Sequence, residues 1–460
     1  MSLPDLIEIT PLTRPIRAEV SVPGSKSITN RALILAALSD ADIELKGALW
    51  SEDTQVMVEA LKTLGFQITV TLDPDEFCNR TIFVQGMGGR IPMAGTDTKP
   101  LELFVGNAGT AARFLAPLVC LGQGMYRLHG VPRMHERPQN ALFQALRNLG
   151  YDVAASNDKL PALIRGAGPK PGHCEVSVRE SSQFASGLIL CSDKGGWRIT
   201  ISAEPSAPPY VQMTSKLMEI FPSTGGSFQI EPDASSGSYF LAADRLAPVA
   251  NDGPGTRPQS IAVAHWPNSG WQIDEHFPEV IRRTTALHDG LENHQKNGTG
   301  NSGIQTRARE SGETDSISRE TDLGDSIMTA IMLAPFAFKP IRFTALGRLR
   351  VQESERVAAL RTELTKCGAK VQETGDTLEV FPSQPHGAEI ETYDDHRIAM
   401  CFAILGLKVP GIRIKNPACV KKTFPNFFQK LAAPGPHGLG AQIIDVATEQ
   451  TLPMAKLFAD

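Results

Sequence analysis

The chain has 460 residues, of which 41% are hydrophobic and 21% charged, and its formal net charge is −5 at pH 7. This length exceeds what one ordinary hydrophobic core organises, so it predicts two domains or three. The acidic balance argues against nucleic acid or an anionic membrane as the main partner, and it leaves cationic side chains to act locally.

The seven cysteines include no Cys-x-x-Cys pair, and their number is odd. This pattern favours reduced thiols over a disulfide framework or a zinc site. Residues 1–17 carry no basic and then apolar leader, and no uncharged apolar run reaches about 18 residues. We therefore expect a soluble cytoplasmic enzyme with no membrane segment.

Alternating apolar and polar residues predict strands of half-buried sheets along the whole chain. In chain order these strands are Arg17–Val22, Arg80–Gly86, Met125–Val131, Trp197–Ala203, Pro340–Leu346, Asp376–Pro382 and Gly411–Asn416. Six further segments each begin with a short polar turn and continue with about ten apolar residues at helical spacing. These turns start at Gly24, Gly106, Glu180, Thr321, Arg350 and Tyr393. Three amphipathic helices without such a turn are predicted at Ser51–Leu64, Pro138–Leu149 and Val211–Ile220.

Strands that alternate with helices predict an α/β fold whose sheets are covered by helices on at least one face. Three of the six polar turns lie in each half of the chain, so we expect two similar domains with a cleft between them. From about residue 288 to residue 320 apolar residues nearly vanish, and this segment is predicted to be an exposed insertion.

Helix starts leave backbone N–H groups free and carry the positive end of the helix dipole, which suits them to hold anions. Five cationic side chains stand at or near these starts, namely Lys26, Arg31, Arg113, Arg356 and Arg397. Six such starts in one chain favour a site for small, highly charged molecules.

Other interpretations of single motifs remain open or are disfavoured. Val22–Ser27 lacks the glycine spacing of a phosphate loop and, taken alone, is compatible with an ordinary capped helix. Arg133 and Arg137 could present two forked donors to an anion, or form a surface ion pair with Glu136. Asp394–Arg397 offers too few oxygen ligands for a hard metal, and its arginine would repel a cation, so we expect no metal.

Eight segments together, in this order, resemble the 5-enolpyruvylshikimate-3-phosphate (EPSP) synthase family. They are PGSKSITNRAL, GNAGTAAR, PRMHERP, SSQF, DSIMT, RVQESER, YDDHRIAM and KKTFPNFF, and the likeness runs from about Ile16 to Phe428. The resemblance implies an inverse α/β barrel fold, with two similar domains of three βαβαββ units each and helix N-termini facing the cleft. The domains are then expected at residues 1–24 with 248–460, which would carry the insertion at about 288–320, and at residues 25–247.

The family moves the enolpyruvyl group of phosphoenolpyruvate onto the 5-hydroxyl of shikimate 3-phosphate and releases phosphate. The resemblance assigns phosphoenolpyruvate to Lys26, Gly109, Arg137, Gln183 and Lys422 at its phosphate and to Arg356 and Arg397 at its carboxylate. It assigns shikimate 3-phosphate to Lys26, Ser27, Arg31, Ser181, Ser182, Gln183, Tyr210, Asp325 and Gln352. Competitive inhibition by glyphosate is implied as well.

Proton transfer in this reaction needs a base for the hydroxyl and an acid for the methylene carbon, so two carboxylates in unlike environments are expected. The resemblance gives the base to Asp325 and the acid to Glu353, with Lys26 in the proton relay. No metal or organic cofactor is expected, because the enol phosphate carries the energy. The partners are then the two small substrates, and we expect a monomer.

The chain departs from the family pattern at three places. Gln352 stands where a lysine is usual, Phe114 where a proline is common, and Ala207 where a serine often lies three residues before Tyr210. One cation that faces shikimate 3-phosphate is therefore missing.

Two rival functions were weighed. The sister enzyme, UDP-N-acetylglucosamine 1-carboxyvinyltransferase, typically has an asparagine after the first lysine, where this chain has Ser27, and a cysteine-bearing loop that is absent from LHGVPRMHERP. A non-catalytic anion-binding protein would lack one of the proton-transfer carboxylates, whereas Asp325 and Glu353 are both present. Both rivals are disfavoured.

Overall fold

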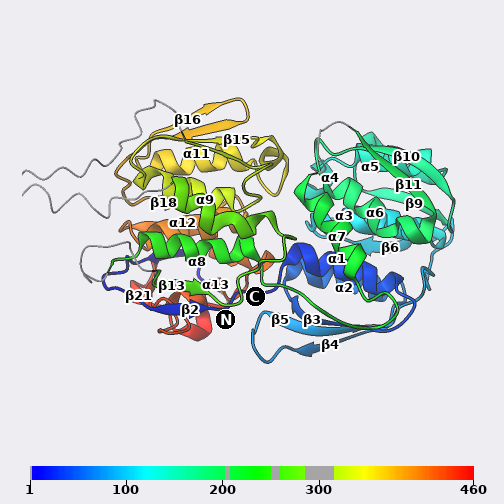
Figure 1. Cartoon of the computed structure of the whole chain (residues 1–460), viewed down its shortest axis with the longest axis horizontal. Coiled ribbons are helices and arrows are strands. Elements are labelled where there is room, and N and C mark those ends of the chain that lie inside the picture. The colour runs from blue at the N-terminus through cyan, green and yellow to red at the C-terminus, as the bar shows by residue number, and fades with distance from the viewer. Residues whose placement is uncertain (1–2, 203–207, 250–258, 285–314, 460) are drawn as a thin grey trace, which may run out of the picture.

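The computed structural model describes residues 3–202, 208–249, 259–284 and 315–459. They form two lobes that lie side by side, and both chain ends belong to the same lobe (Figure 1). We call that body the first lobe and the other the second lobe.

The second lobe is built from three sheets and the helices between them. Its strands are β3 (Ile43–Leu49), β4 (Ile68–Leu72), β5 (Asn79–Val84), β6 (Leu101–Phe104), β7 (Gln123–His129), β8 (Asp152–Ala155), β9 (Ala162–Ala167), β10 (Gly172–Ser177), β11 (Trp197–Ser202) and β12 (Gly226–Gln229). Its helices are α1 (Lys26–Leu38), α2 (Glu52–Thr63), α3 (Gly109–Cys120), α4 (Pro132–Glu136), α5 (Asn140–Asn148), α6 (Gln183–Gly195) and α7 (Pro209–Ile220).

The first lobe also contains three sheets. Its strands are β1 (Leu6–Ile9), β2 (Ala18–Val20), β13 (Ile261–Val263), β14 (Asp315–Ser318), β15 (Ile341–Thr344), β16 (Val371–Thr374), β17 (Thr377–Val380), β18 (Glu389–Ile390), β19 (Ile412–Lys415), β20 (Ile443–Asp445) and β21 (Gln450–Thr451). Its helices are α8 (Ala234–Leu246), α9 (Phe277–Thr284), α10 (Ile327–Leu333), α11 (Arg356–Lys366), α12 (His396–Gly406) and α13 (Phe427–Ala432).

One sheet pattern recurs in both lobes. In the orders β6-β7-β9-β8 and β14-β15-β17-β16, the first two strands are parallel and the remaining pairings are antiparallel. With the intervening helices α3 and α5, or α10 and α11, each of these is a complete βαβαββ unit. The sheet β12-β3-β5-β4 has the same pattern, but its edge strand comes from later in the chain.

The helices lie inside each lobe and the sheets outside. Every residue of α3 in the second lobe and of α12 in the first is buried. Both sequences are apolar nearly all round, and such helices are stable when neighbours cover every face. In β2, β15 and β19 buried and exposed residues alternate, so one face of each strand packs on the helices. This arrangement agrees with the predicted inverse α/β barrel.

Two separate hydrophobic cores mark the lobes. One contains residues from Ile28 to Ile230, and the other contains residues 3–22 together with residues from Tyr239 onwards. Helix α8 was expected in the second domain, because the boundary was placed at 247/248, but its buried residues belong to the first core. We therefore propose that the second domain ends near Glu231.

The chain passes between the lobes twice, and the two crossing segments lie side by side. Gly24 pairs with Pro232 in an isolated antiparallel bridge, and the Ser25 N–H donates to the Glu231 carbonyl at 2.8 Å. Close to this point, the buried carboxylate of Glu76 from the second lobe accepts hydrogen bonds from Lys430 at 2.7 Å and Ser21 at 2.8 Å. This contact joins the lobes beside the crossings.

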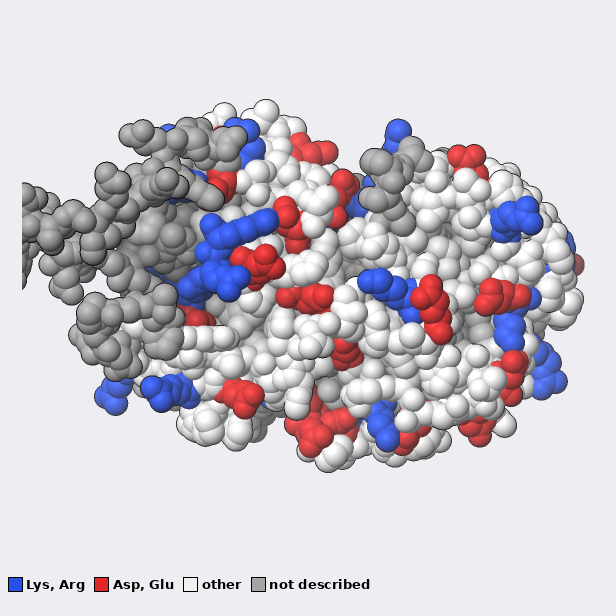
Figure 2. Space-filling view, viewed as in Figure 1, with Lys and Arg blue, Asp and Glu red and all other residues white. Residues whose placement is uncertain are grey.

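The seven predicted strands and the nine predicted helices are all present, with ends shifted by a few residues. The predicted insertion differs at its end, since Asp315–Ser318 forms β14 and pairs with β15. Residues 288–314 of that segment, and Ala207, lie outside the described residues. None of the described helices is long and apolar enough to cross a membrane. Acidic and basic side chains alternate over the face in Figure 2, so that face carries no broad cationic surface.

Candidate active site

The six predicted helix starts meet at one cavity between the lobes. It is lined by Lys26 and Ser27 of α1, Gly109 and Thr110 of α3, Gln183 of α6, Asp325 just before α10, Arg356 of α11 and Arg397 of α12. Among the described residues, no side chain caps the N-terminus of α1 or α3, so the first N–H groups of these two helices keep their capacity to bind anions. The sequence therefore predicted the framework of this site.

Of the predicted site residues, all but Lys422 line this cavity. Lys422 lies at its edge, where its ammonium is 3.6 Å from Oε1 of Glu353 and donates to the Asn107 carbonyl at 3.4 Å. Arg137 from the opposite lobe donates to the same carbonyl at 3.0 Å. The two cations expected at one phosphate thus converge on one point from different lobes.

The second-lobe wall holds three buried arginines whose partners are uncharged. Arg31 donates to Thr214, Ser186 and two backbone carbonyls, Arg113 to the carbonyls of Gly109 and Pro138, and Arg137 to Asn107. Burial lowers the pKa of all three, that of Arg31 to about 10, and the neighbouring Arg137 lowers the pKa of Arg113 further. Since most of its N–H groups already have protein partners, Arg31 has little left for the predicted shikimate 3-phosphate contact. Lys26 differs from these arginines, because its ammonium lies 3.1 Å from Asp53.

Gly109 lies where the second-lobe arginines meet. A Cβ built on it would stand 2.7 Å from Nη2 of Arg137 and 2.9 Å from Nη1 of Arg113, closer than side chains approach one another. Any side chain here would displace Arg113 and the guanidinium of Arg137, which the resemblance assigns to the phosphate. The glycine therefore sets the width of this end of the cavity.

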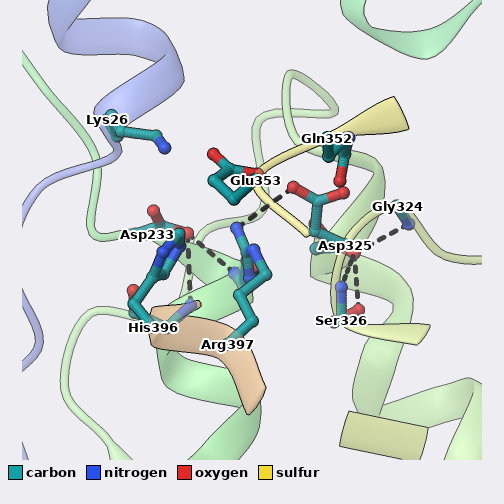
Figure 3. Close-up of polar contacts among 12 residues, drawn as sticks. Lys26, Asp233, Gly324, Asp325, Ser326, Gln352, Glu353, His396 and Arg397 are labelled. Carbon is teal, nitrogen blue, oxygen red and sulfur yellow. Dashed lines mark hydrogen bonds and ion pairs between the residues drawn. The ribbon is translucent and has the colours of Figure 1, made fainter. Parts of the chain in front are cut away.

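On the first-lobe wall, Asp325 is held between two guanidiniums. Its Oδ1 lies 2.7 Å from Nη2 of Arg319. Its Oδ2 lies 3.1 Å from Nη2 of Arg397 (Figure 3). Burial works to raise the pKa of Asp325, but Arg397 and Arg319 outweigh it and hold that pKa below its ordinary value. Asp325 is therefore ionised, as a base must be.

Glu353 has the same kind of environment. Its Oε2 lies 2.8 Å from Arg356, which also holds the buried Asp395 through two contacts of 2.7 and 3.1 Å. Against the effect of burial, Arg356 and Lys422 keep the pKa of Glu353 well below its ordinary value. The predicted acid thus carries a proton only when something else engages these cations.

The loop that carries Asp325 is fixed from behind by Asp274. Oδ1 of Asp274 accepts hydrogen bonds from the N–H groups of Gly324 at 2.8 Å and Ser326 at 3.1 Å. These two residues flank Asp325 (Figure 3). Burial, and then Asp325, raises the pKa of Asp274. The contrast expected between Asp325 and Glu353 is therefore absent in this structure, because both have a lowered pKa; it is Asp274 that differs from Asp325.

Ser181, Ser182, Gln183 and Tyr210 line the cavity on the side of α6 and α7. The Gln183 N–H donates to Oγ of Ser181 at 3.2 Å. Gln352 also lines the cavity, but its side-chain oxygen accepts a hydrogen bond from Arg356.

Sequence reasoning missed several cavity residues, namely Asp53, Asp233, Ser235, Asp274, Arg319 and Arg348. Asp233 caps α8 by accepting from the N–H groups of Ser235 and Ser236, and Ser235 in turn accepts from Arg397. The Asp-x-Ser-Ser segment was a readable N-cap signal. The helix itself was missed because its small residues show no clear helical period.

His396 is buried beside Asp395 at the start of α12, and neither of its ring nitrogens has a hydrogen-bond partner among the described residues. Burial, and then the charge of Lys26, lowers the pKa of His396 well below its ordinary value, so the ring is neutral. In the described part of the chain, no three His, Cys, Asp or Glu side chains are grouped as metal ligands.

A two-lobed α/β protein with buried cations, two ionised carboxylates and free helix N-termini around one cleft is built to hold two anions together. A family model for EPSP synthase (3-phosphoshikimate 1-carboxyvinyltransferase) matches residues 12–431. The chain belongs to this family, which confirms the resemblance found in the sequence and the predicted enzyme class.

Relatives and solved structures agree with this assignment. Proteins named 3-phosphoshikimate 1-carboxyvinyltransferase from Opitutus terrae and Trichormus variabilis are each 37% identical to the chain, covering 94% and 93% of it and 98% of their own lengths. An EPSP synthase structure from Acinetobacter baumannii superposes with a TM-score of 0.69 at 19% identity, covering 96% of this chain and all of that one. The enolpyruvyl transferase NikO from Streptomyces tendae gives 0.64 at 14% identity, over 98% of this chain and all of that one. These likenesses confirm the predicted fold.

Proposed function

We propose that this cavity transfers the enolpyruvyl group of phosphoenolpyruvate to the 5-hydroxyl of shikimate 3-phosphate, with release of phosphate. One observation carries the proposal: two ionised carboxylates, Asp325 and Glu353, face a cavity whose other wall holds three buried arginines that contact uncharged partners. Two anionic substrates repel each other, and only such a concentration of positive charge holds them at reacting distance.

The phosphate of phosphoenolpyruvate belongs at Arg137, Lys422 and Lys26, with Gly109 leaving room for it. Arg137 and Lys422 already converge on the Asn107 carbonyl, and the free N-terminus of α3 lies beside them. The carboxylate belongs at Arg356 and Arg397, whose planar forks suit it. Shikimate 3-phosphate then occupies the side of Ser27, Ser181, Ser182, Gln183 and Tyr210.

Substrate binding switches the protonation of Glu353. The positive charges of Arg356 and Lys422 lower the pKa of Glu353. These same two cations are assigned to phosphoenolpyruvate. When the substrate anion engages them, less positive charge acts on Glu353, and burial raises its pKa toward the range of a general acid. The switch thus makes the acid only when the donor substrate is present.

The proton balance follows from these positions. Glu353 gives a proton to the methylene carbon, and the 5-hydroxyl oxygen bonds to the adjacent carbon while Asp325 takes the hydroxyl proton. The tetrahedral ketal then loses a proton from the methyl carbon to Glu353 as its C–O bond to phosphate breaks. The proton on Asp325 leaves with the phosphate, and the family resemblance gives Lys26 a part in this relay.

A phosphate-release assay with both substrates tests the proposal. We expect release that requires shikimate 3-phosphate together with phosphoenolpyruvate and that does not occur with UDP-N-acetylglucosamine as acceptor. The Asp325→Asn variant, prepared in the same way, controls for contaminating phosphatases. Phosphate release with UDP-N-acetylglucosamine but not with shikimate 3-phosphate as acceptor, or no release with either acceptor, contradicts the proposal.

We further infer a monomer that acts in the cytoplasm. All seven cysteines are free thiols and buried, which suits a reducing compartment. The cavity draws every side chain named above from one chain, so no second copy is needed to complete it. Sedimentation at assay concentration tests the monomer.

A further inference from the structure

Arg319 is a buried cation of the cavity that the family likeness does not assign. It follows β14, where its N–H donates to the Thr344 carbonyl at 3.1 Å, and its side chain is only 6% exposed. The guanidinium lines the cavity and contacts Oδ1 of Asp325 at 2.7 Å. Its Nε is buried and has no hydrogen-bond partner among the described residues. One N–H donor of the Arg319 guanidinium is therefore unused, and a buried donor without a partner lowers the stability of the folded protein.

The cation expected nearby is missing. Gln352 stands where the family usually has a lysine, and its side-chain oxygen is engaged by Arg356 while its carbonyl accepts from Arg133 at 3.2 Å. Gln352 and Asp325 lie on neighbouring loops of the same cavity (Figure 3). The first-lobe wall thus lacks a positive charge at residue 352 and has one at residue 319.

We propose that Arg319 binds shikimate 3-phosphate, by donating to the ring hydroxyl oxygens beside Asp325, and so supplies the positive charge that Gln352 does not. The proposal rests on the proposed function, because it takes Asp325 as the base that meets those hydroxyls. A hydroxyl bound to Oδ1 of Asp325 lies within about 2.7–3 Å of it. Arg319 contacts that same oxygen, so its fork reaches the hydroxyl without moving far.

The position of Arg319 favours shikimate 3-phosphate over phosphoenolpyruvate. Arg319 contacts Asp325, and the preceding Gly324 lies beside Tyr210, since a Cβ built on Gly324 would stand 3.1 Å from the Tyr210 hydroxyl, so this loop faces the α7 side of the cavity. The groups assigned to the donor phosphate, Gly109, Arg137 and Lys422, cluster instead around the Asn107 carbonyl.

The test is a double-mutant cycle with Arg319→Gln, Gln352→Lys and the double variant, in steady-state assays with each substrate varied. Losing one charge-assisted contact should raise the KM for shikimate 3-phosphate roughly 10- to 100-fold in Arg319→Gln. The KM for phosphoenolpyruvate should change less than about threefold. In the double variant, the new lysine should recover most of the lost affinity. Gln352→Lys should therefore lower this KM far more in the Arg319→Gln background than in the parent.

Arg283→Gln is the matched control. Arg283 lies outside the cavity lining and holds Asp322 of the same loop through a contact of 2.7 Å, but it is half exposed. Its loss should leave both KM values unchanged.

Two results would overturn the proposal. If Arg319→Gln lowers kcat with no change in the KM for shikimate 3-phosphate, Arg319 only orients Asp325. If Gln352→Lys has the same effect in both backgrounds, the two positions do not serve one contact; this second result can be read from kinetics even where Arg319→Gln is poorly stable. Inactivity of the parent with both substrates would instead contradict the proposed function.

Discussion

On the second-lobe wall, Arg31, Arg113 and Arg137 contact uncharged acceptors among the described residues, whereas on the first-lobe wall Arg319, Arg356 and Arg397 each contact a carboxylate. The pKa values record this difference. Burial lowers the pKa of Arg113 and Arg137, while Asp395 and Asp325 respectively raise those of Arg356 and Arg397 despite burial. The three arginines of the second-lobe wall are therefore available to bind an anion. On the first-lobe wall, carboxylates already balance the charges of the arginines, and these carboxylates are available for proton transfer.

The largest expected effect comes from removing a carboxylate of the first-lobe wall. Asp325→Asn and Glu353→Gln should each lower kcat about 100- to 10,000-fold, because each removes one proton transfer from the transition state. Binding of both substrates, measured by calorimetry, should survive. Glu355→Gln is the control, since Glu355 caps α11 through the Ala358 N–H and pairs with Arg350 but does not line the cavity. Near-normal kcat in either variant would remove that residue from the mechanism.

Stability should distinguish the two walls next. Arg356→Gln leaves Asp395 and Glu353 buried without their cation, which should cost about 3–5 kcal/mol of unfolding free energy. Arg137→Gln leaves no buried carboxylate without its cation, so the urea concentration at the midpoint of unfolding should equal or exceed that of the parent. Equal loss of stability in both variants would show that the walls do not differ in this way.

The second-lobe wall can also be narrowed without changing its charge. In Gly109→Ala the new methyl displaces Arg137 and Arg113, which should weaken glyphosate, the longer ligand, more than phosphoenolpyruvate. We expect the ratio of the glyphosate inhibition constant to the KM for phosphoenolpyruvate to rise roughly tenfold or more. A parent already as insensitive as the variant would mean that Phe114 or another residue narrows the cavity.

The smallest effect is the response to a simple anion. Inorganic phosphate at ten times its dissociation constant should raise the melting temperature by roughly 2 °C, because it binds only the folded second-lobe wall. The shift should shrink in Arg137→Gln and with added chloride. An identical shift in parent and variant would place the anion elsewhere.

Much of this site could be predicted because each helix start carries its own local signal. Lys26, Gly109, Gln183, Arg356 and Arg397 stand in short polar turns before apolar helices, so the sequence showed both their chemistry and their position. The pairing of charges depends on contacts between distant segments, such as Arg397 with Asp325, and no local pattern encodes it.

The cavity residues that sequence reasoning missed lie where no local sequence pattern indicates a strand, a helix or a site. Arg319 lies at the end of a segment so polar that no strand was expected there, although Asp315–Ser318 forms β14 through pairing with β15. Asp274 follows no apolar period, and its role arises from two N–H groups fifty and more residues away. The boundary that we propose before α8 could not be predicted, because α8 is made of small residues that reveal no buried face.

The order of the two lobes along the chain affects how the protein folds during synthesis. The second lobe is one continuous stretch between the two crossings, so it can fold as soon as that stretch has left the ribosome. Strand β1 of the first lobe pairs with β19, where Ile7 lies opposite Ile414, and with β20. At about 5–20 residues per second, β1 therefore waits roughly 20 to 80 s for its partners. During that time Leu6–Ile9 is an unpaired apolar strand, and the nascent chain depends on early folding of the second lobe or on chaperones to keep it from pairing wrongly.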